Sequence, residues 1–312
     1  MAQKVSFAKE SAAPVLIVGS VAYDNIETPY ATGERILGGS ASYAGLAASY
    51  YAPVRMVGVI GNDFAASDID RLKARDIDVE GIETDDTGPT FFWRGKYYEN
   101  FNKRDTLELQ LNVFASFQPK IPESYKDSPF LMLGNIHPQL QAEVLAAARG
   151  KPFTIADTID FWIETEKEAL LQLIKNIDLF IINDDEATLL TGEPDYISAG
   201  RKLIQIGPKI AIVKKGSHGA YLFHPEGMFA IPAYPVTDLR DPTGAGDSFA
   251  GALLGYLAAK NDTSFAAIKK AMLYATVTAS LTVEAFSCDR LESAGSKAIE
   301  ERHAELLKLI SL

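Results

Sequence analysis

Several features are scarce in this sequence of 312 residues, and each scarcity removes a class of protein. The single cysteine, Cys288, makes no intramolecular disulfide, and the four histidines form no pair at metal-ligand spacing, which argues against a structural zinc site. No run approaches about 18 consecutive apolar residues, and the N-terminal stretch lacks the apolar core of a signal peptide. We therefore expect a protein of the reducing cytoplasm that does not enter a membrane.

Positive charge is also in short supply. The chain has 30 Lys+Arg against 41 Asp+Glu, a net charge of −11. An acidic surface repels phosphate backbones and anionic headgroups over about one Debye length. Nucleic acids and membrane surfaces are therefore excluded as expected partners, whereas a composition of 47% hydrophobic and 10% aromatic residues is typical of a globular protein.

Some nucleotide and catalytic motifs are missing as well. There is no Gly-x-x-x-x-Gly-Lys-Ser/Thr loop and no Gly-x-Gly-x-x-Gly after the first expected strand, which excludes P-loop NTPases and dinucleotide-binding folds. The chain also lacks a Gly-x-Ser-x-Gly elbow and the His-Arg-Asp set of protein kinases. A phosphate site, if there is one, must be built from other residues.

What is present is a regular alternation of short apolar runs with longer amphipathic stretches, which predicts a parallel sheet covered by helices. The expected strands are residues 15–19, 54–60, 130–134, 153–156, 179–182 and 210–214. The expected helices between them are 62–75, 138–148, 164–175 and 196–206. A hairpin over 221–231 and helices over 247–260, 264–281 and from about 293 follow.

Two segments, 24–37 and 77–113, alternate polar with apolar or aromatic residues, which is typical of antiparallel strands with one wet face. We assign both to a small β-sheet lid inserted into a single α/β domain that spans 1–312. Aromatic stripes on strands usually form packing surfaces, and these could also form a homodimer interface. Arg94 and Lys96 lie among them and are candidate contacts for a polar or anionic substrate.

Polar residues follow the expected strands. In open parallel sheets ligands bind outside the carboxyl ends of the strands, so one crevice could collect these side chains. They include Asp24 after the first strand, with Asp157, Asn183 and Glu186 after later ones.

The strongest local signal is the string Asp-Pro-Thr-Gly-Ala-Gly-Asp at 241–247, directly before a helical pattern. Small residues at a helix start leave backbone N–H groups uncovered, and with the helix dipole they form a site for a phosphate or an oxyanion. Asp247 is a candidate base beside the amides of Gly244, Ala245 and Gly246. Read alone, the same string is equally compatible with a tight turn and an N-cap.

Four motifs in order resemble the ribokinase-like (PfkB) family of carbohydrate and nucleoside kinases over nearly the whole chain. They are the Gly38-Gly39 pair before a small-residue helix together with 57–64, the Asn-Asp-Asp-Glu string at 183–186, the Lys-Lys-Gly-Ser-His-Gly string at 214–219, and 241–247. The resemblance implies a three-layer α/β/α fold with a mostly parallel central sheet. It also implies an ATP-dependent transfer of the γ-phosphoryl group to a primary hydroxyl of a small sugar or nucleoside.

The resemblance also implies roles for individual residues. Asp247 would accept the hydroxyl proton while the amides of Gly244–Gly246 hold the transferring group. Asn183 and Glu186 would organise Mg²⁺ through its waters, and Asp24, Gly38 and Gly39 would hold the acceptor. The nucleotide would be bound by Lys214, Gly216, Ser217, His218 and Gly219. Asp241 and Thr243 resemble ligands of a monovalent cation such as K⁺, and Asp157 is a lower-ranked substrate contact.

One departure concerns the acceptor. Many sugar and nucleoside kinases carry Asn five residues after the first glycine, where this sequence has Tyr43, so the family's ribose-binding pair is not assumed. The alternative to a kinase is a ligand-binding or regulatory protein that kept the fold and lost turnover. The intact 244–247 string favours the enzyme, and the sequence leaves the acceptor open.

Overall fold

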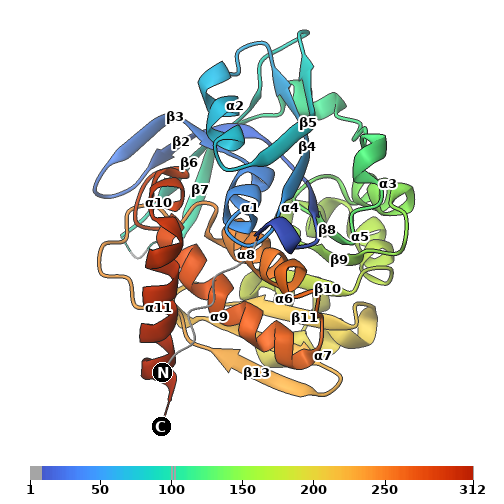
Figure 1. The fold of residues 1–312 in the computed structure, drawn as a ribbon, viewed down its shortest axis with the longest axis vertical. Coiled ribbons are helices and arrows are strands. Elements are labelled where there is room, and N and C mark those ends of the chain that lie inside the picture. Colours follow the sequence, from blue (N-terminus) through green and yellow to red (C-terminus); the bar gives the residue numbers. More distant parts are fainter. Residues whose placement is uncertain (1–8, 100, 102, 312) are drawn as a thin grey trace.

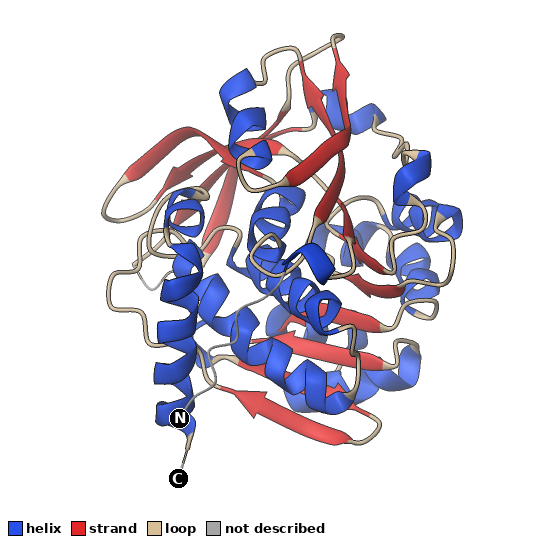
Figure 2. Ribbon diagram, viewed as in Figure 1, coloured by secondary structure: helices blue, strands red, loops and turns tan. Residues whose placement is uncertain are grey.

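The computed structural model of the chain describes residues 9–99, 101 and 103–311, and these residues form a large sheet flanked by helices (Figures 1 and 2). Its strand order is β13-β12-β11-β10-β9-β8-β1-β4-β5. The strands from β11 to β5 are parallel, and β12 and β13 add an antiparallel hairpin. The predicted α/β fold with a mostly parallel sheet is confirmed.

Apart from β5, the strands of this sheet lie where the sequence predicts them, within about one residue. Their bounds are β1 Val15–Val18, β4 Val54–Gly61, β5 Ile77–Asp85, β8 Phe130–Leu133, β9 Phe153–Ala156, β10 Leu179–Asn183, β11 Ile210–Lys214, β12 Ala220–His224 and β13 Gly227–Ile231. Val, Ile and Leu dominate because a parallel sheet is buried on both faces.

Helices cover both faces of this sheet. Side chains of a strand alternate between faces, and in β1 Val15 and Ile17 join one core while Leu16 and Val18 join the other. The first core packs against α1 Ser40–Ala48, α2 Ala66–Lys73, α8 Ala245–Lys260, α9 Phe265–Thr282, α10 Asp289–Ser293 and α11 Gly295–Ile310. The second packs against α3 Pro138–Ala147, α4 Asp160–Thr165, α5 Lys167–Ile174, α6 Asp184–Thr191 and α7 Tyr196–Ile206. The three-layer arrangement is thus confirmed.

A separate four-stranded sheet forms the lid, in the order β3-β2-β6-β7. Its strands are β2 Ala22–Glu27, β3 Thr32–Gly38, β6 Phe91–Tyr97 and β7 Arg104–Gln110. Two expectations were wrong here. Residues 77–85 are not lid but β5, the edge strand of the main sheet, and β2 pairs with β6 in parallel rather than antiparallel.

Close packing of α1 against α8 brings the segments that precede these two helices together. A Cβ atom added to Gly251 would lie 2.1 Å from the Ala44 carbonyl oxygen, so only glycine permits this approach. Both helices are made largely of Ala, Gly and Ser and are buried all round. As a result the N-terminus of α8 lies next to the Gly38-Gly39 turn that begins α1.

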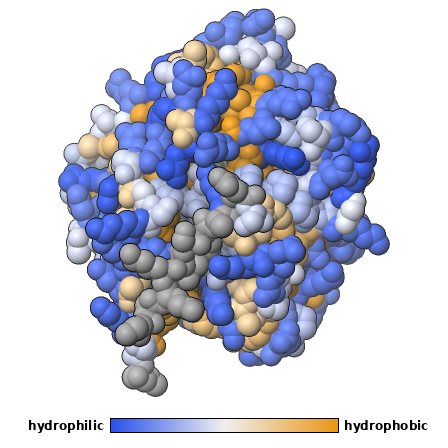
Figure 3. All heavy atoms as spheres, viewed as in Figure 1, coloured by the Kyte–Doolittle hydropathy of each residue, from blue (hydrophilic) through white to orange (hydrophobic). Residues whose placement is uncertain are grey.

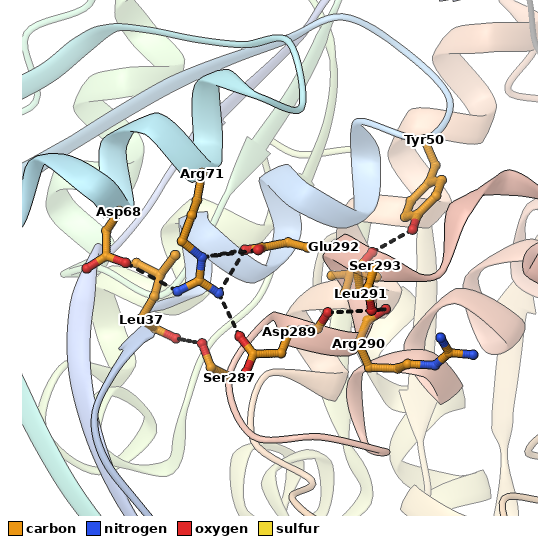
Figure 4. Close-up of polar contacts among 10 residues, drawn as sticks. All are labelled: Leu37, Tyr50, Asp68, Arg71, Ser287, Asp289, Arg290, Leu291, Glu292 and Ser293. Atoms are coloured by element: carbon orange, nitrogen blue, oxygen red, sulfur yellow. Dashed lines mark hydrogen bonds and ion pairs between the residues drawn. The ribbon is translucent and has the colours of Figure 1, made fainter.

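Polar contacts tie the base of the lid to α2 and α10 (Figure 4). The Leu37 carbonyl at the end of β3 accepts a hydrogen bond from the Ser287 hydroxyl at 2.6 Å. Arg71 of α2 donates to Glu292 at 3.1 Å and to Asp289 at 2.9 Å, and thereby holds α10 against α2. The root of the lid is therefore fixed to the main body.

The molecular surface agrees with the composition. The face in Figure 3 is covered mainly by hydrophilic residues, with small apolar patches between them. Within the described part of the chain, no helix is both long enough and apolar enough to cross a membrane.

Candidate active site

The carboxyl ends of two parallel strands and the start of α8 bring the charged residues of the site together. Asp157 follows β9, and Lys214 ends β11. Asp247 lies in the first turn of α8. A Cβ atom added to Gly246 would lie 2.5 Å from Lys214 Nζ, so the ammonium sits directly over the helix N-terminus.

Asp157 is buried and Asp247 is half-buried, and the two form a carboxyl pair. Their side chains are hydrogen-bonded to each other, which requires a proton between them. Burial raises the pKa of both groups, and the nearby Lys214 ammonium opposes this. The pKa of Asp157 is raised further by the Asp247 charge, whereas the hydrogen bond from Asp157 lowers the pKa of Asp247. The proton therefore belongs to Asp157, and Asp247 is the more acidic partner.

The loop before α8 has the shape of an anion site. Gly244 is left-handed with φ 74° and caps the helix, and the ring of Tyr43 packs under it at a distance that leaves no room for a Cβ atom. Helix geometry leaves the N–H groups of the first turn without intrahelical partners. The Ala245 N–H, by contrast, donates to the Pro242 carbonyl at 3.2 Å, so of the three predicted amides it is already engaged.

Asp24 lies in a buried position on β2, with 4% of its surface exposed. A Cβ atom added to Gly38 would lie 2.0 Å from Asp24 Oδ2, so glycine at 38 makes room for this carboxylate. Burial raises the pKa of Asp24 well above its usual range, and the charges of Asp241 and Asp247 add to this. Gly39, with φ 93°, turns the chain from β3 into α1 beside it.

Asn183 and Glu186 form a capping box at the start of α6. The Glu186 N–H donates to Asn183 Oδ1 at 2.7 Å, and the Asn183 N–H donates to Glu186 Oε2 at 3.0 Å. Burial raises the pKa of Glu186. Among the described residues no group of three or more His, Cys, Asp or Glu is placed to hold a metal directly.

Asp241 is almost fully buried in the loop before α8. Its Oδ1 accepts the Thr243 N–H at 2.9 Å, while its Oδ2 has no partner within the described chain. Burial raises the pKa of Asp241 to about 6. The Thr243 hydroxyl donates to the Tyr97 hydroxyl of β6 at 3.1 Å, which links this loop to the lid.

The loop after β11 is open to solvent. Gly216, Ser217 and His218 are exposed, and Gly219, with φ 91°, lies so close to the Ile231 carbonyl that a Cβ atom there would be 1.9 Å from the oxygen. The loop adjoins Lys214, but the contacts of Ser217 and His218 with a nucleotide stay a prediction.

Two predicted substrate contacts do not face the crevice as expected. Arg94 is exposed and donates to Glu27 at 3.1 Å. It lies one residue beyond Trp93, the register partner of Asp24, and therefore on the opposite face of the lid sheet. The Tyr43 ring is buried under Gly244, so Tyr43 supports the anion site rather than offering an open acceptor surface.

Sequence reasoning missed Arg104, the first residue of β7. It is the register partner of Tyr97 and shares the crevice-facing side of the lid with Trp93 and Asp24. Its positive charge lowers the pKa of Asp24, Asp247 and Glu186. The sequence shows that residues 93, 95 and 97 share one face of their strand. Residue 104 can be assigned to the same face only when the register of the β6–β7 hairpin is known.

Residues 13–294 match the pfkB family of carbohydrate kinases. The chain is 28% identical to a cytidine kinase from Thermococcus kodakarensis over 78% of this chain and 88% of that protein. It is 26% identical to a bifunctional ribokinase/ribose-5-phosphate isomerase A from Fructilactobacillus sanfranciscensis, over 86% of this chain and 52% of that one. It is 23% identical to a 2-dehydro-3-deoxygluconokinase from Thermoproteus tenax, over 70% of this chain and 71% of that protein.

Solved structures share the fold. A Burkholderia thailandensis nucleoside kinase in complex with inosine superimposes with a TM-score of 0.79 at 23% identity, covering 94% of this chain and 99% of that one. An E. coli protein in complex with ATP and Mg²⁺ gives a TM-score of 0.78 at 19% identity, with the same coverage.

The chain therefore belongs to the pfkB family of carbohydrate kinases, and the predicted ribokinase-like fold is confirmed. It is a phosphotransferase of the sugar and nucleoside kinase class, in a family that uses ATP.

Proposed function

We propose that the chain transfers the γ-phosphoryl group of ATP to a primary hydroxyl of a small sugar or nucleoside, with Asp247 as the base. The observation that carries this proposal is the constellation at the start of α8. There a half-buried carboxylate lies beside uncovered helix amides and near the Lys214 ammonium. In this proposal the proton acceptor and the anion site lie within one helical turn.

The residues of the chain divide the work as follows. Asp247 orients the acceptor hydroxyl and takes its proton while the hydroxyl oxygen bonds to the γ-phosphorus. The bond to the β–γ bridging oxygen breaks, and ADP leaves with that electron pair. The amides of Gly244 and Gly246 and the Lys214 ammonium stabilise charge on the transferring group. Because the transition state of phosphoryl transfer is loose, a carboxylate that orients the hydroxyl is a sufficient base.

Mg²⁺ fits the chain as an ion held through water. Asn183 Oδ1 and Glu186 Oε2 already accept backbone hydrogen bonds, which leaves Glu186 Oε1 to bind water of a hydrated ion. When bound, Mg²⁺ supplies positive charge at the phosphates. K⁺ fits the orphaned Oδ2 of Asp241, with Thr243 beside it.

Three further assignments belong to this proposal. The 216–219 loop beside Lys214 binds the nucleotide. The lid forms a homodimer interface, for which exposed Leu107 and Leu109 on the edge strand β7 provide apolar surface. The protein works in the cytoplasm, where its free, buried Cys288 stays reduced.

ADP release from ATP by the purified protein, measured across sugars, nucleosides and cyclitols with Mg²⁺ present, tests the proposal. We expect at least one acceptor to stimulate release, and mass spectrometry to show a phosphate on its primary hydroxyl. Binding of acceptors without any stimulation would favour the catalytically silent alternative.

A further inference from the structure

The inner face of the lid is built around one flat aromatic side chain. A Cβ atom added to Gly95 would lie 2.1 Å from the Trp93 ring, so the indole lies flat over the glycine. The Trp93 indole N–H donates to the Thr106 hydroxyl of β7 at 3.1 Å, which fixes the plane of the ring. One face of the indole is therefore used against the sheet, and the other points away from it.

The free face of Trp93 is occupied by a cation. The Arg104 guanidinium carbon lies over the ring, 5.6 Å from its centroid. The Arg104 guanidinium also lies near the Tyr97 hydroxyl, where its positive charge opposes the rise that burial causes in the pKa of Tyr97. The Tyr97 hydroxyl in turn contacts Thr243 in the loop before α8. Arg104 is thus held by two aromatic groups on the crevice side of the lid, in a position tied to the start of α8.

Arg104 feels the charges of Asp160 and Glu186 through space, but it forms no ion pair with a carboxylate among the described residues. Within the described residues, no carboxylate oxygen lies within 4.0 Å of an Arg104 nitrogen, whereas Arg94 on the outer face is paired with Glu27. Arg104 is open to solvent as the structure stands. An acceptor that fills the crevice displaces this water, and a desolvated guanidinium then requires acceptor oxygens or an anion.

We propose that Arg104 binds a carboxylate of the phosphoryl acceptor, so that the acceptor is a sugar acid rather than a neutral sugar or nucleoside. This inference rests on the proposed kinase function. A guanidinium presents a planar fork of N–H donors that matches a carboxylate in two parallel hydrogen bonds. Asp24, at the register position of Trp93, takes hydroxyl groups of the same molecule.

The arrangement of Trp93 disfavours a nucleobase. A base stacks on an open aromatic face, but one face of this indole lies on Gly95 and the other lies under Arg104. The relatives do not choose between the classes, because they include a cytidine kinase, a ribokinase and a 2-dehydro-3-deoxygluconokinase. The positive charge of Arg104 on the lid is the feature that favours an acidic acceptor over a neutral one.

Matched acceptors and matched variants test this inference. Aldonic and 2-keto aldonic acids are compared with the corresponding aldoses and alditols, and with cytidine, uridine and inosine. Turnover is measured by ADP release and binding by calorimetry. The variants are Arg104→Gln and Arg104→Lys, and the control is Arg94→Gln on the outer face of the same strand pair. Far-UV circular dichroism and the Tm confirm that each variant is folded.

We expect a sugar acid to give the highest kcat/KM. Arg104→Gln should lower that value about 10²-fold, because hydrogen bonds to a charged group are lost. Arg104→Lys should recover part of the loss, since it restores charge without the planar fork, and Arg94→Gln should stay within about twofold of the native enzyme.

Other outcomes separate this inference from the kinase proposal. A neutral sugar or nucleoside as the best acceptor overturns the inference and leaves the kinase function intact. Arg104-dependent binding of a sugar acid without turnover of any acceptor supports the inference and contradicts the kinase function. Absence of both turnover and Arg104-dependent binding of a sugar acid overturns both.

Discussion

The carboxyl group of Asp157, at the end of β9, is hydrogen-bonded to the carboxyl group of Asp247, in the first turn of α8. Asp157 is buried and Asp247 is half-buried, and Lys214 is the nearby cation that favours their charge. In the proposed mechanism the proton is on Asp157, and Asp247 is the ionised partner that accepts a proton from the substrate. We therefore propose that Asp157 is a positioning residue that sets the basicity of Asp247.

Replacement of Asp157 should move the acid limb of the pH–kcat/KM profile. The pKa of Asp247 is already raised above the 3.8 of a free aspartate. We therefore expect the acid limb, where activity is lost as the pH falls, to lie at a pH higher than 3.8. Asp157→Ala removes a hydrogen bond that lowers the pKa of Asp247, so the acid limb should move to higher pH. Asp157→Asn can still donate this bond and should leave the limb near its native position. An acid limb at lower pH in Asp157→Ala would mean that Asp157 acts through its charge instead.

Asp24→Ala should affect one substrate more than the other. In our proposal the lost carboxylate contacts only the acceptor, so acceptor KM should rise by at least about tenfold while ATP KM changes little. Gly38→Ala should reproduce this pattern. The added Cβ atom would lie 2.0 Å from Asp24 Oδ2, which is too close, so the carboxylate would have to move. Steady-state kinetics with each substrate varied provide the measurement, and equal effects on both KM values would make Asp24 structural.

Gly246→Ala tests the anion site at the start of α8. The added Cβ atom would lie 2.5 Å from Lys214 Nζ, and the flexible lysine can move away without unfolding the chain. We expect kcat to fall about 10–10²-fold with Tm nearly unchanged, because a positioned donor to the transferring group is displaced. Gly88→Ala is the matched control, since a Cβ atom there meets only Val113 at 3.5 Å. A native kcat in Gly246→Ala would contradict the proposed role of Lys214 in the anion site.

Asp241→Asn tests the monovalent cation. Asp241 Oδ2 is buried without a partner, and a carboxylate in that state is stabilised by a bound cation. If K⁺ binds there, activity and Tm of the native protein should be higher in K⁺ than in the same concentration of tetramethylammonium, and Asp241→Asn should lose both differences. Equal behaviour of the native protein in the two salts would exclude the site.

The main sheet could be predicted from the sequence because its strands are short apolar runs that parallel sheets bury on both faces. The error at 77–85 has a physical cause, since β5 is an edge strand whose exposed and buried residues alternate as they do in a lid strand. The break between α4 and α5 at Glu166 was also missed, because no Gly or Pro marks it.

Site residues that lie at strand ends or at a helix start could be predicted from the local sequence. Site residues whose position depends on how the lid strands pair could not. Asp157, Lys214 and Asp247 follow strand ends or begin a helix, so their convergence follows from a parallel sheet. Arg94 and Arg104 lie on opposite faces of the lid, and only the registers of β6 with β2 and β7 distinguish them.

The most direct measurement is single-turnover phosphoryl transfer by Asp247→Asn, with the acceptor found in the panel and saturating ATP. The asparagine keeps the size of the side chain, so Tm and acceptor binding should stay near native. The rate should fall by about 10²–10⁴-fold, which is the usual contribution of a positioned base. A rate within a few-fold of native would contradict the assignment of Asp247 as the base.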